Sequence, residues 1–209
     1  MKIAILTTKN QWFEPYAEEL SKKLGNTPIF NNHVDFDGNY DIIFILSYHK
    51  IIPQEVLKKN GHNIIFHESL LPKGKGWAPL FWQILEGKSN ISFTMIEASD
   101  GVDSGDIYMQ KMLELAGNEF NEELRDKQAK LTIQMCLEFV NNYEQYKNPV
   151  EQSGDESFYV KRTKEDSRLD IDKTIREQFN LLRIVNNDDY PAYFELEGNR
   201  YILKIELDN

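Results

Sequence analysis

Short apolar runs of strand-forming residues alternate with helix-like stretches along most of this 209-residue chain. KIAIL opens the series, and TPIF, YDIIFILS and NIIFH follow it. Between the first two runs, EPYAEELSKKL places apolar residues at helical spacing, and Gly25 ends that helix. An alternation of strands and helices is typical of a parallel sheet covered by helices. The unbroken apolar run in YDIIFILS also indicates a strand that is buried on both faces.

The second half of the chain continues this alternation and then changes character. APLFWQILEG predicts a helix, ISFTMIEA and GDIYMQKMLEL predict strands, and residues 118–146 predict one long amphipathic helix. The polar stretch NPVEQSGDES follows, and the chain ends in two β-rich runs joined by Glu197–Gly198–Asn199. We expect an α/β fold with a mostly parallel sheet in residues 1–150. Residues 151–209 should form a short C-terminal extension that ends in a β-hairpin.

Charge and composition exclude several classes of protein. The formal net charge of −10 leaves no excess of Lys and Arg to neutralise nucleic-acid phosphates, although one local basic pocket stays open. The apolar run in MKIAILTTKN is too short for a signal-peptide core or a membrane span. The single cysteine, Cys136, falls in a helical stretch and is expected to be a packed apolar residue. We expect a cytoplasmic protein with no membrane partner and no nucleic-acid partner.

His67 ends the run NIIFH, and a loop rich in glycine and proline follows it. Pro72, Gly74, Gly76 and Pro79 fall within eight residues of this loop. Ligands bind an open α/β sheet where its strands end, and an imidazole titrates near neutral pH. His67 is therefore a candidate proton donor or acceptor. A histidine that only caps the strand is an equally good interpretation.

A second candidate cluster, SDGVDSGD, lies between two predicted strands. It holds Asp100, Asp103 and Asp106 together with two glycines. One of these carboxylates could reach the end of the His67 strand and orient the imidazole. A turn or a helix cap is the alternative for such an acidic loop.

Several of these stretches resemble one enzyme family. HESLLPKGKGWAP is similar to the H-x-S-L-L-P…G…P signature of enzymes that use N10-formyltetrahydrofolate as a formyl donor, and GVDSGDI is similar to their L-D-x-G-D-I loop. SYHKIIPQEVL resembles the segment before their catalytic strand, so the likeness runs over roughly residues 40–110. YVKRTKEDSRLD is similar to an R-R-x-P-E-D-x motif of longer members. The resemblance implies a Rossmann-like sheet with helices on both faces.

The resemblance also implies an acyl-transfer reaction without a metal. An amine would attack the formyl carbon of the folate, and His67 would take the proton or stabilise the oxyanion. Asp103 would tune or orient His67. The residues that would contact the folate are those of the two matching loops: Leu70, Leu71, Pro72, Gly101, Val102 and Gly105.

One position departs from the family pattern. Members usually carry Asn-x-His, with the asparagine holding the formyl oxygen, whereas this chain has Ile65. Asn63 shares the strand face of His67 but lies about 6–7 Å further along the strand than the usual residue, at about 3.3 Å per residue. Asn63, Ser69, a loop N–H or a water molecule is expected to replace the missing donor. The alternatives are a non-catalytic folate- or nucleotide-binding relic and a formyltransferase that acts on another amine, such as glycinamide ribonucleotide.

The acceptor is expected to be a nucleoside-diphosphate-linked 4-amino-4,6-dideoxy sugar, because the chain looks most like the small sugar-nucleotide N-formyltransferases, including those of pseudaminic-acid pathways. Length and charge argue against methionyl-tRNA as acceptor. The glycinamide ribonucleotide enzyme has a glycine run after its first strand that LTTKNQWFEP lacks. The candidate substrate contacts are Trp12, Lys75, Gly76, Trp77, Lys161 and Arg162. The choice between UDP and dTDP, and the formation of a homodimer, stay open.

Overall fold

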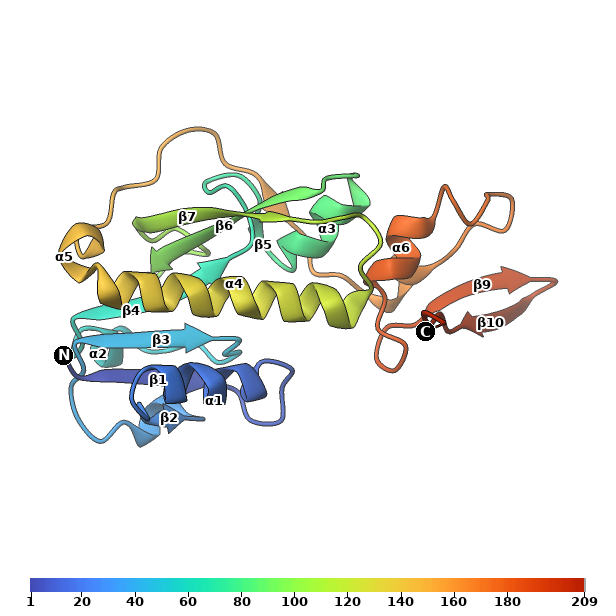
Figure 1. Cartoon of the computed structure of the whole chain (residues 1–209). Helices are drawn as coiled ribbons and strands as arrows, with labels where there is room; N and C mark the ends of the chain where they lie inside the picture. The colour runs from blue at the N-terminus through green and yellow to red at the C-terminus, as the bar shows by residue number, and fades with distance from the viewer. Residues whose placement is uncertain (209) are drawn as a thin grey trace.

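The computed structural model describes residues 1–208, in which six strands form one sheet in the order β2-β1-β3-β4-β6-β7 (Figure 1). The parallel strands are β1 (Ile3–Thr7), β2 (Ile29–Phe30), β3 (Ile42–Leu46) and β4 (His62–His67). Strand β6 (Asn90–Glu97) runs antiparallel to β4 and forms a hairpin with β7 (Ile107–Glu114). The expected α/β fold with a mostly parallel sheet is confirmed.

Helices lie close to the predicted positions. They are α1 (Glu14–Lys23), α2 (Gln54–Leu57), α3 (Pro79–Leu85), α4 (Asn121–Asn141) and α5 (Tyr143–Tyr146), with a 3-10 turn η1 (His33–Asp35). The single helix predicted over residues 118–146 is wrong in one respect. The backbone of Asn142, at φ −118° and ψ 37°, leaves the helical region and separates α4 from α5. No helix within residues 1–208 is long and apolar enough to cross a membrane.

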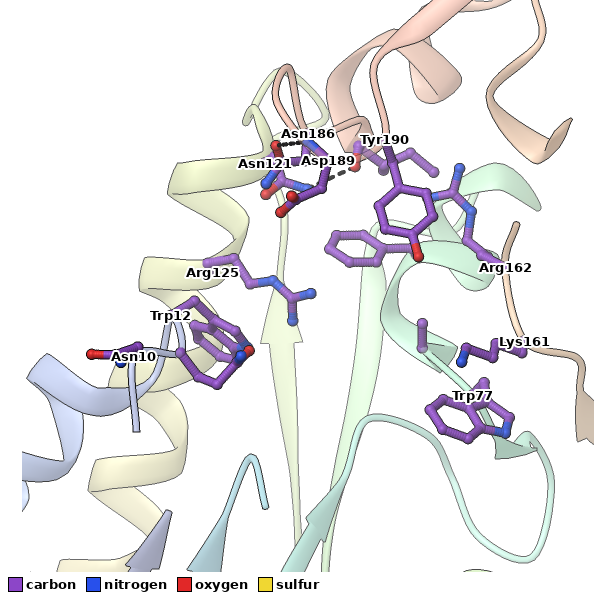
Figure 2. Close-up of a pocket in the computed structure, with 14 residues that line it drawn as sticks. Asn10, Trp12, Trp77, Asn121, Arg125, Lys161, Arg162, Asn186, Asp189 and Tyr190 are labelled. Carbon is purple, nitrogen blue, oxygen red and sulfur yellow. Dashed lines mark hydrogen bonds between the residues drawn. The ribbon is translucent and has the colours of Figure 1, made fainter. Parts of the chain in front are cut away.

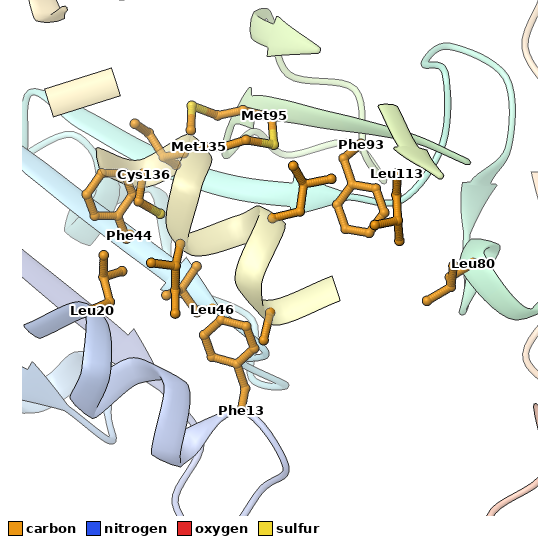
Figure 3. Close-up of a cluster of buried hydrophobic side chains, with 14 of the residues drawn as sticks. Phe13, Leu20, Phe44, Leu46, Leu80, Phe93, Met95, Leu113, Met135 and Cys136 are labelled. Carbon is orange, nitrogen blue, oxygen red and sulfur yellow. The ribbon is translucent and has the colours of Figure 1, made fainter. Parts of the chain in front are cut away.

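Alternating side chains of the strands feed two apolar clusters on opposite faces of the sheet. Figure 3 shows the larger cluster, in which Phe44 and Met95 from the sheet meet Met135 and Cys136 from α4. The smaller cluster packs Leu6 and its neighbours in β3 beneath α2. Cys136 is fully buried, as expected for a packed apolar residue. Helices thus cover both faces, which leaves the carboxyl ends of the strands as the place for a ligand.

The C-terminal extension returns along the sheet before it forms its own small unit. Val150 pairs with Ile107 at the start of β7. Next, β8 (Phe158–Tyr159) runs parallel to β5 (Lys75–Gly76), a short strand in the loop that follows His67. The remaining elements are η2 (Lys164–Ser167), α6 (Phe179–Ile184), β9 (Ala192–Leu196) and β10 (Asn199–Leu203). The last two form the expected hairpin, which projects beyond the sheet (Figure 1). The domain division at residue 150 stays a prediction.

Candidate active site

His67 is the last residue of β4, and its ring is almost fully enclosed. Its Nε2 lies 2.7 Å from the carbonyl oxygen of Gly74. A carbonyl oxygen only accepts hydrogen bonds, so Nε2 carries the proton in this arrangement. Nδ1 then faces the carboxylate of Asp103, whose Oδ1 lies 3.5 Å away. The two side chains therefore lie close together, as expected, and their catalytic roles stay a prediction.

Asp103 lies in the loop between β6 and β7, and residues of neighbouring segments hold it in place. Oδ2 of Asp103 accepts a hydrogen bond of 2.8 Å from the N–H of Gly76. The side chain of Gln152 donates to the carbonyl oxygens of Asp103 and Gly105, each at 2.8 Å. A Cβ at Gly105 would lie 1.6 Å from the carbonyl oxygen of Glu97, so only glycine fits there. The carboxylate is therefore fixed with one oxygen on the loop and the other toward His67.

Lys75 is buried and does not line the cavity described below, so its expected contact with a substrate stays a prediction. Its side chain is 3% exposed and forms an ion pair with Glu156 of the extension. The N–H of Lys75 also donates to the carbonyl oxygen of Ser157 at 2.9 Å. The backbone requires glycine at position 76, because a Cβ there would lie 2.4 Å from the carbonyl oxygen of Tyr159. Both residues join the loop to β8.

Of the two side chains expected to replace the family asparagine, Asn63 is used elsewhere and the Ser69 hydroxyl is buried without a hydrogen-bond partner among residues 1–208. The side-chain amide of Asn63 donates to the carbonyl oxygen of Leu57 and to Glu97, and so ties α2 to the sheet. Ser69 is 2% exposed, and a Cβ added at Gly74 would lie 2.9 Å from the Ser69 Cβ. The Ser69 hydroxyl thus lies beneath the loop. Ile65 packs against the smaller apolar cluster.

The loops expected to hold the folate present some apolar residues to solvent and bury others. Leu70 is 55% exposed and Val102 is 64% exposed. Leu71, Pro72 and Gly105 are buried, and Gly101 is exposed. The hydrogen bond between Asp103 and Gly76 joins the two loops. Leu70, Gly101 and Val102 are consequently the members of the predicted folate set that are exposed to a ligand.

A cavity of about 590 Å³ lies where the β1–α1 loop, α3, α4 and the C-terminal extension meet (Figure 2). Four of the six predicted substrate residues line it: Trp12, Trp77, Lys161 and Arg162. The other lining residues are Asn10, Gln11, Ala78, Phe81, Asn121, Arg125, Ile184, Asn186, Asp189 and Tyr190. The lining carries three cationic side chains and one carboxylate. In a chain of net charge −10, this cavity is a local basic site.

Aromatic rings hold the cations of this cavity in place. The Arg125 guanidinium lies 4.4 Å from the ring centre of Trp12 and 4.6 Å from that of Phe81. Lys161 Nζ lies 4.9 Å from the ring centre of Trp77, and Figure 2 places this pair across the cavity from Arg125. Burial lowers the pKa of Arg125 to about 10, so the guanidinium stays charged at neutral pH.

Arg162 is the most constrained of the three cations. Its Nη2 donates to the carbonyl oxygen of Asp166 at 3.3 Å and to the Ser167 hydroxyl at 3.4 Å. Its Nε is buried without a hydrogen-bond partner among residues 1–208. Burial lowers the pKa of this group as well. Arg162 therefore keeps unused donor capacity beside the cavity.

Arg125, in the first turns of the long helix α4, is a cavity residue that the sequence did not predict. On the sequence it reads as one more charged residue on a solvated helix face. Only the packing of α4 against the β1–α1 loop brings it to the cavity wall, as the contact with Trp12 shows. No three His, Cys, Asp or Glu side chains within residues 1–208 are grouped so that they could hold a metal ion.

Known proteins resemble the chain in sequence and in fold. A family model described as Formyl transferase matches residues 36–140. Methionyl-tRNA formyltransferase of Ehrlichia ruminantium (strain Gardel) is 34% identical over 157 residues, covering 75% of this chain and 50% of that protein. The structure of methionyl-tRNA formyltransferase from Clostridium thermocellum matches with a TM-score of 0.82 at 21% identity, covering 100% of this chain and 94% of that one. A sugar N-formyltransferase from Shewanella sp FDAARGOS_354 matches with a TM-score of 0.71 at 16% identity, covering 100% of both chains.

These comparisons differ in what they establish. The two structural likenesses lie below 25% identity and show the fold alone. The chain spans about half the length of the curated relatives it matches. These relatives are named methionyl-tRNA formyltransferases, whereas the sequence analysis placed the chain nearer to sugar-nucleotide enzymes. The family model covers half of the chain, including His67 and Asp103. The chain belongs to the formyl transferase family.

Proposed function

We propose that this chain transfers a formyl group from N10-formyltetrahydrofolate to the amine of a nucleoside-diphosphate-linked 4-amino-4,6-dideoxy sugar. The product would enter a surface or flagellar glycan, as in pseudaminic-acid pathways. In this proposal residues 1–150 supply the transfer chemistry, and residues 151–209 complete the acceptor pocket. A homodimer stays a prediction.

The observation that carries the proposal is the basic, aromatic cavity in an acidic chain. A nucleoside diphosphate offers two phosphate groups and a flat base. Arg125, Lys161 and Arg162 supply cations for the phosphates, and charge-assisted hydrogen bonds to such groups are among the stronger ones in proteins. Trp12, Trp77 and Tyr190 supply rings for the base or for the apolar face of the sugar.

The proposed reaction uses His67 through Nδ1. The amine nitrogen bonds to the formyl carbon, and a tetrahedral intermediate forms. Because Gly74 holds the proton on Nε2, Nδ1 is the atom with a lone pair for the proton that the attacking nitrogen loses. Oδ1 of Asp103, 3.5 Å away, stabilises the resulting imidazolium. The proton then passes to N10 of the folate as the carbon–N10 bond breaks.

Ile65 favours the second candidate function, a non-catalytic binding protein. One oxyanion donor is worth about 2.7–4 kcal/mol in acyl-transfer sites, which corresponds to about 10²–10³ in rate. The Asn63 amide is engaged with Leu57 and Glu97, whereas the buried Ser69 hydroxyl has no hydrogen-bond partner among residues 1–208. In an active enzyme the Ser69 hydroxyl and the protonated Nδ1 of His67 would be the remaining side-chain donors for the oxyanion.

A panel of acceptors tests the proposal. The chain is incubated with N10-formyltetrahydrofolate and, separately, with UDP- and dTDP-linked 4-amino-4,6-dideoxy sugars, glycinamide ribonucleotide or methionyl-tRNA. Mass spectrometry should detect the gain of one formyl group on an amino sugar nucleotide. The matched 4-hydroxy sugar nucleotide is the control and should stay unchanged.

The other outcomes separate the alternatives. Product with methionyl-tRNA or glycinamide ribonucleotide alone would replace the acceptor but keep the reaction. Tight folate binding without product from any acceptor would establish the binding relic.

A further inference from the structure

Glu68 is a carboxylate placed beside His67 that the reaction above does not use. It is the first residue after β4 and occupies the variable position in the His-x-Ser stretch. Its carbonyl oxygen accepts a hydrogen bond of 2.6 Å from the side chain of Gln83 in α3. Its Oε1 accepts a hydrogen bond from the side-chain amide of Gln128 in α4. Two helices therefore fix both the backbone and the side chain of Glu68.

The side chain of Glu68 connects to the wall of the acceptor cavity. Gln128 is 6% exposed, and its Oε1 accepts a hydrogen bond of 3.0 Å from Nη1 of Arg125. Arg125 in turn lines the cavity between Trp12 and Phe81. The side-chain amide of Gln128 thus bridges the Glu68 carboxylate and Arg125, and Glu68 directly follows His67 in the sequence.

One oxygen of this carboxylate is free. No other residue within 1–208 donates a hydrogen bond to Oε2 of Glu68, and Oε2 is not among the buried atoms that lack a partner. Oε2 therefore keeps access to solvent, while Oε1 is held by Gln128. Such a half-satisfied carboxylate is ready to accept a hydrogen bond from a cation.

The surroundings of Glu68 favour its protonated form more than water does. Burial raises the pKa of the Glu68 carboxyl, and the charges of His67 and Arg125 and the bond from Gln128 offset part of that rise. The group therefore takes a proton more readily than an ordinary surface glutamate. This proton affinity suits a group that alternates between carboxylate and carboxylic acid.

We propose that Glu68 recognises the amine of the acceptor: Oε2 holds the acceptor's ammonium and takes the proton that the nitrogen must lose before it can attack. This inference rests on the proposed formyl transfer to an amino sugar nucleotide. The first proton passes from the ammonium to Glu68 and later to solvent. The freed lone pair forms the bond to the formyl carbon. The second proton leaves through His67 to N10 as the carbon–N10 bond breaks, so atoms and charges balance.

The competing interpretation is that Glu68 only positions Arg125 through Gln128. The two interpretations differ in what they require of the ligand. A base for the amine discriminates an amine from a hydroxyl at the same carbon. A support for Arg125 affects the phosphates, which both ligands share.

Binding measurements on Glu68→Gln separate these interpretations. The amide keeps an oxygen for Gln128 but cannot bind an ammonium as a carboxylate does. Calorimetry at pH 7 would compare a dTDP-4-amino sugar with its 4-hydroxy analogue on the wild type, on Glu68→Gln and on the control Glu55→Gln. Glu55 is an exposed residue of α2, on the opposite face of the sheet from α4.

The expected result is a loss of discrimination. The wild type and Glu55→Gln should bind the amine about 10- to 100-fold more tightly than the hydroxyl analogue, as a hydrogen bond to a charged group allows. Glu68→Gln should bind both ligands equally, with its affinity for the hydroxyl analogue unchanged. A preserved preference for the amine, or equal weakening of both ligands, would overturn the inference. Failure of the wild type to bind either nucleotide would overturn the proposed function and this inference together.

A pH profile gives a second readout with the same variant. Glu68→Gln should lower kcat/KM at pH 7 by about 10²–10⁴-fold, the usual contribution of a general base. The deficit should shrink as the pH rises toward the pKa of the amine, because the neutral amine then exists without help. A deficit of constant size at every pH would indicate a structural role and contradict the inference.

Discussion

The buried carboxylate of Glu119, which pairs with Arg183 of the C-terminal extension, should be a major source of stability in this protein. Glu119 precedes α4, and Arg183 lies in α6; their side chains are 5% and 2% exposed. Nη1 of Arg183 lies 3.2 Å from Oε2 of Glu119. The other donors to this carboxylate are Lys127 Nζ at 2.6 Å, the N–H of Ala116 at 2.7 Å and the N–H of Gly117 at 3.0 Å. The variant Glu119→Gln removes the charge but keeps the size.

The magnitude follows from the pKa of this carboxyl. Burial alone would raise the pKa of Glu119, but the bonds from Lys127 and from the backbone N–H groups outweigh burial and lower it to about 2. A pKa lowered from an ordinary 4.5 to about 2 corresponds, at about 1.4 kcal/mol for each pKa unit, to about 3 kcal/mol. Breaking a buried ion pair typically costs about 3–5 kcal/mol. We expect Glu119→Gln to lose about 3 kcal/mol of unfolding free energy at pH 7.

The pH dependence gives the sign of the effect. Because the folded-state pKa is lower than the unfolded one, the stabilisation is present above about pH 4.5 and is lost as the pH falls toward 2. Urea unfolding followed by circular dichroism should show about 2 kcal/mol of the difference remaining at pH 3.5. The control is Glu144→Gln, which removes an exposed pair with Lys147 and should leave the midpoint unchanged. A difference below about 1 kcal/mol at pH 7, or one that does not depend on pH, would refute this reasoning.

Three further predictions concern catalysis. His67→Ala should lower kcat by about 10²–10⁴-fold while folate affinity, measured by fluorescence titration, stays within a few-fold; near wild-type turnover would contradict its role. Asp103→Asn should lower kcat and alter the pH–rate profile, because it removes the charge 3.5 Å from the imidazole; an unchanged profile would leave Asp103 a structural residue. Lys161→Ala should raise the KM of the sugar nucleotide about tenfold and leave the KM of the folate unchanged. The reason is that the sugar nucleotide, and not the folate, is expected to contact the Lys161–Trp77 pair. Equal changes in both KM values would place Lys161 outside the diphosphate site.

Local patterns were enough to predict the sheet and the position of His67. Alternation of apolar runs and helical spacing is a property of neighbouring residues, and each predicted strand of the sheet appears within a few residues of its place. The one misplaced boundary, at Asn142, comes from backbone angles that helical periodicity does not reveal. The residues themselves suggested that one of Asp100, Asp103 and Asp106 orients His67, but only the resemblance to a known family singled out Asp103.

Tertiary packing decides the environment of charged residues whose partners lie far away in the sequence. Lys75 reads as a free loop cation, yet Glu156 covers it from 81 positions away. The sequence predicts a surface position for Arg125, but the packing of α4 places it against Trp12. The hydrogen-bond partner of Glu68, Gln128, lies 60 positions away in the sequence.

The sequence by itself determined which segments become strands and helices and placed His67 at a strand end, because periodicity and chain-breaking residues act over a few neighbouring positions. Only the tertiary structure decided which charges are buried, paired or open to a ligand. Burial and electrostatic environment depend on what packs nearby in space, whatever the separation along the chain.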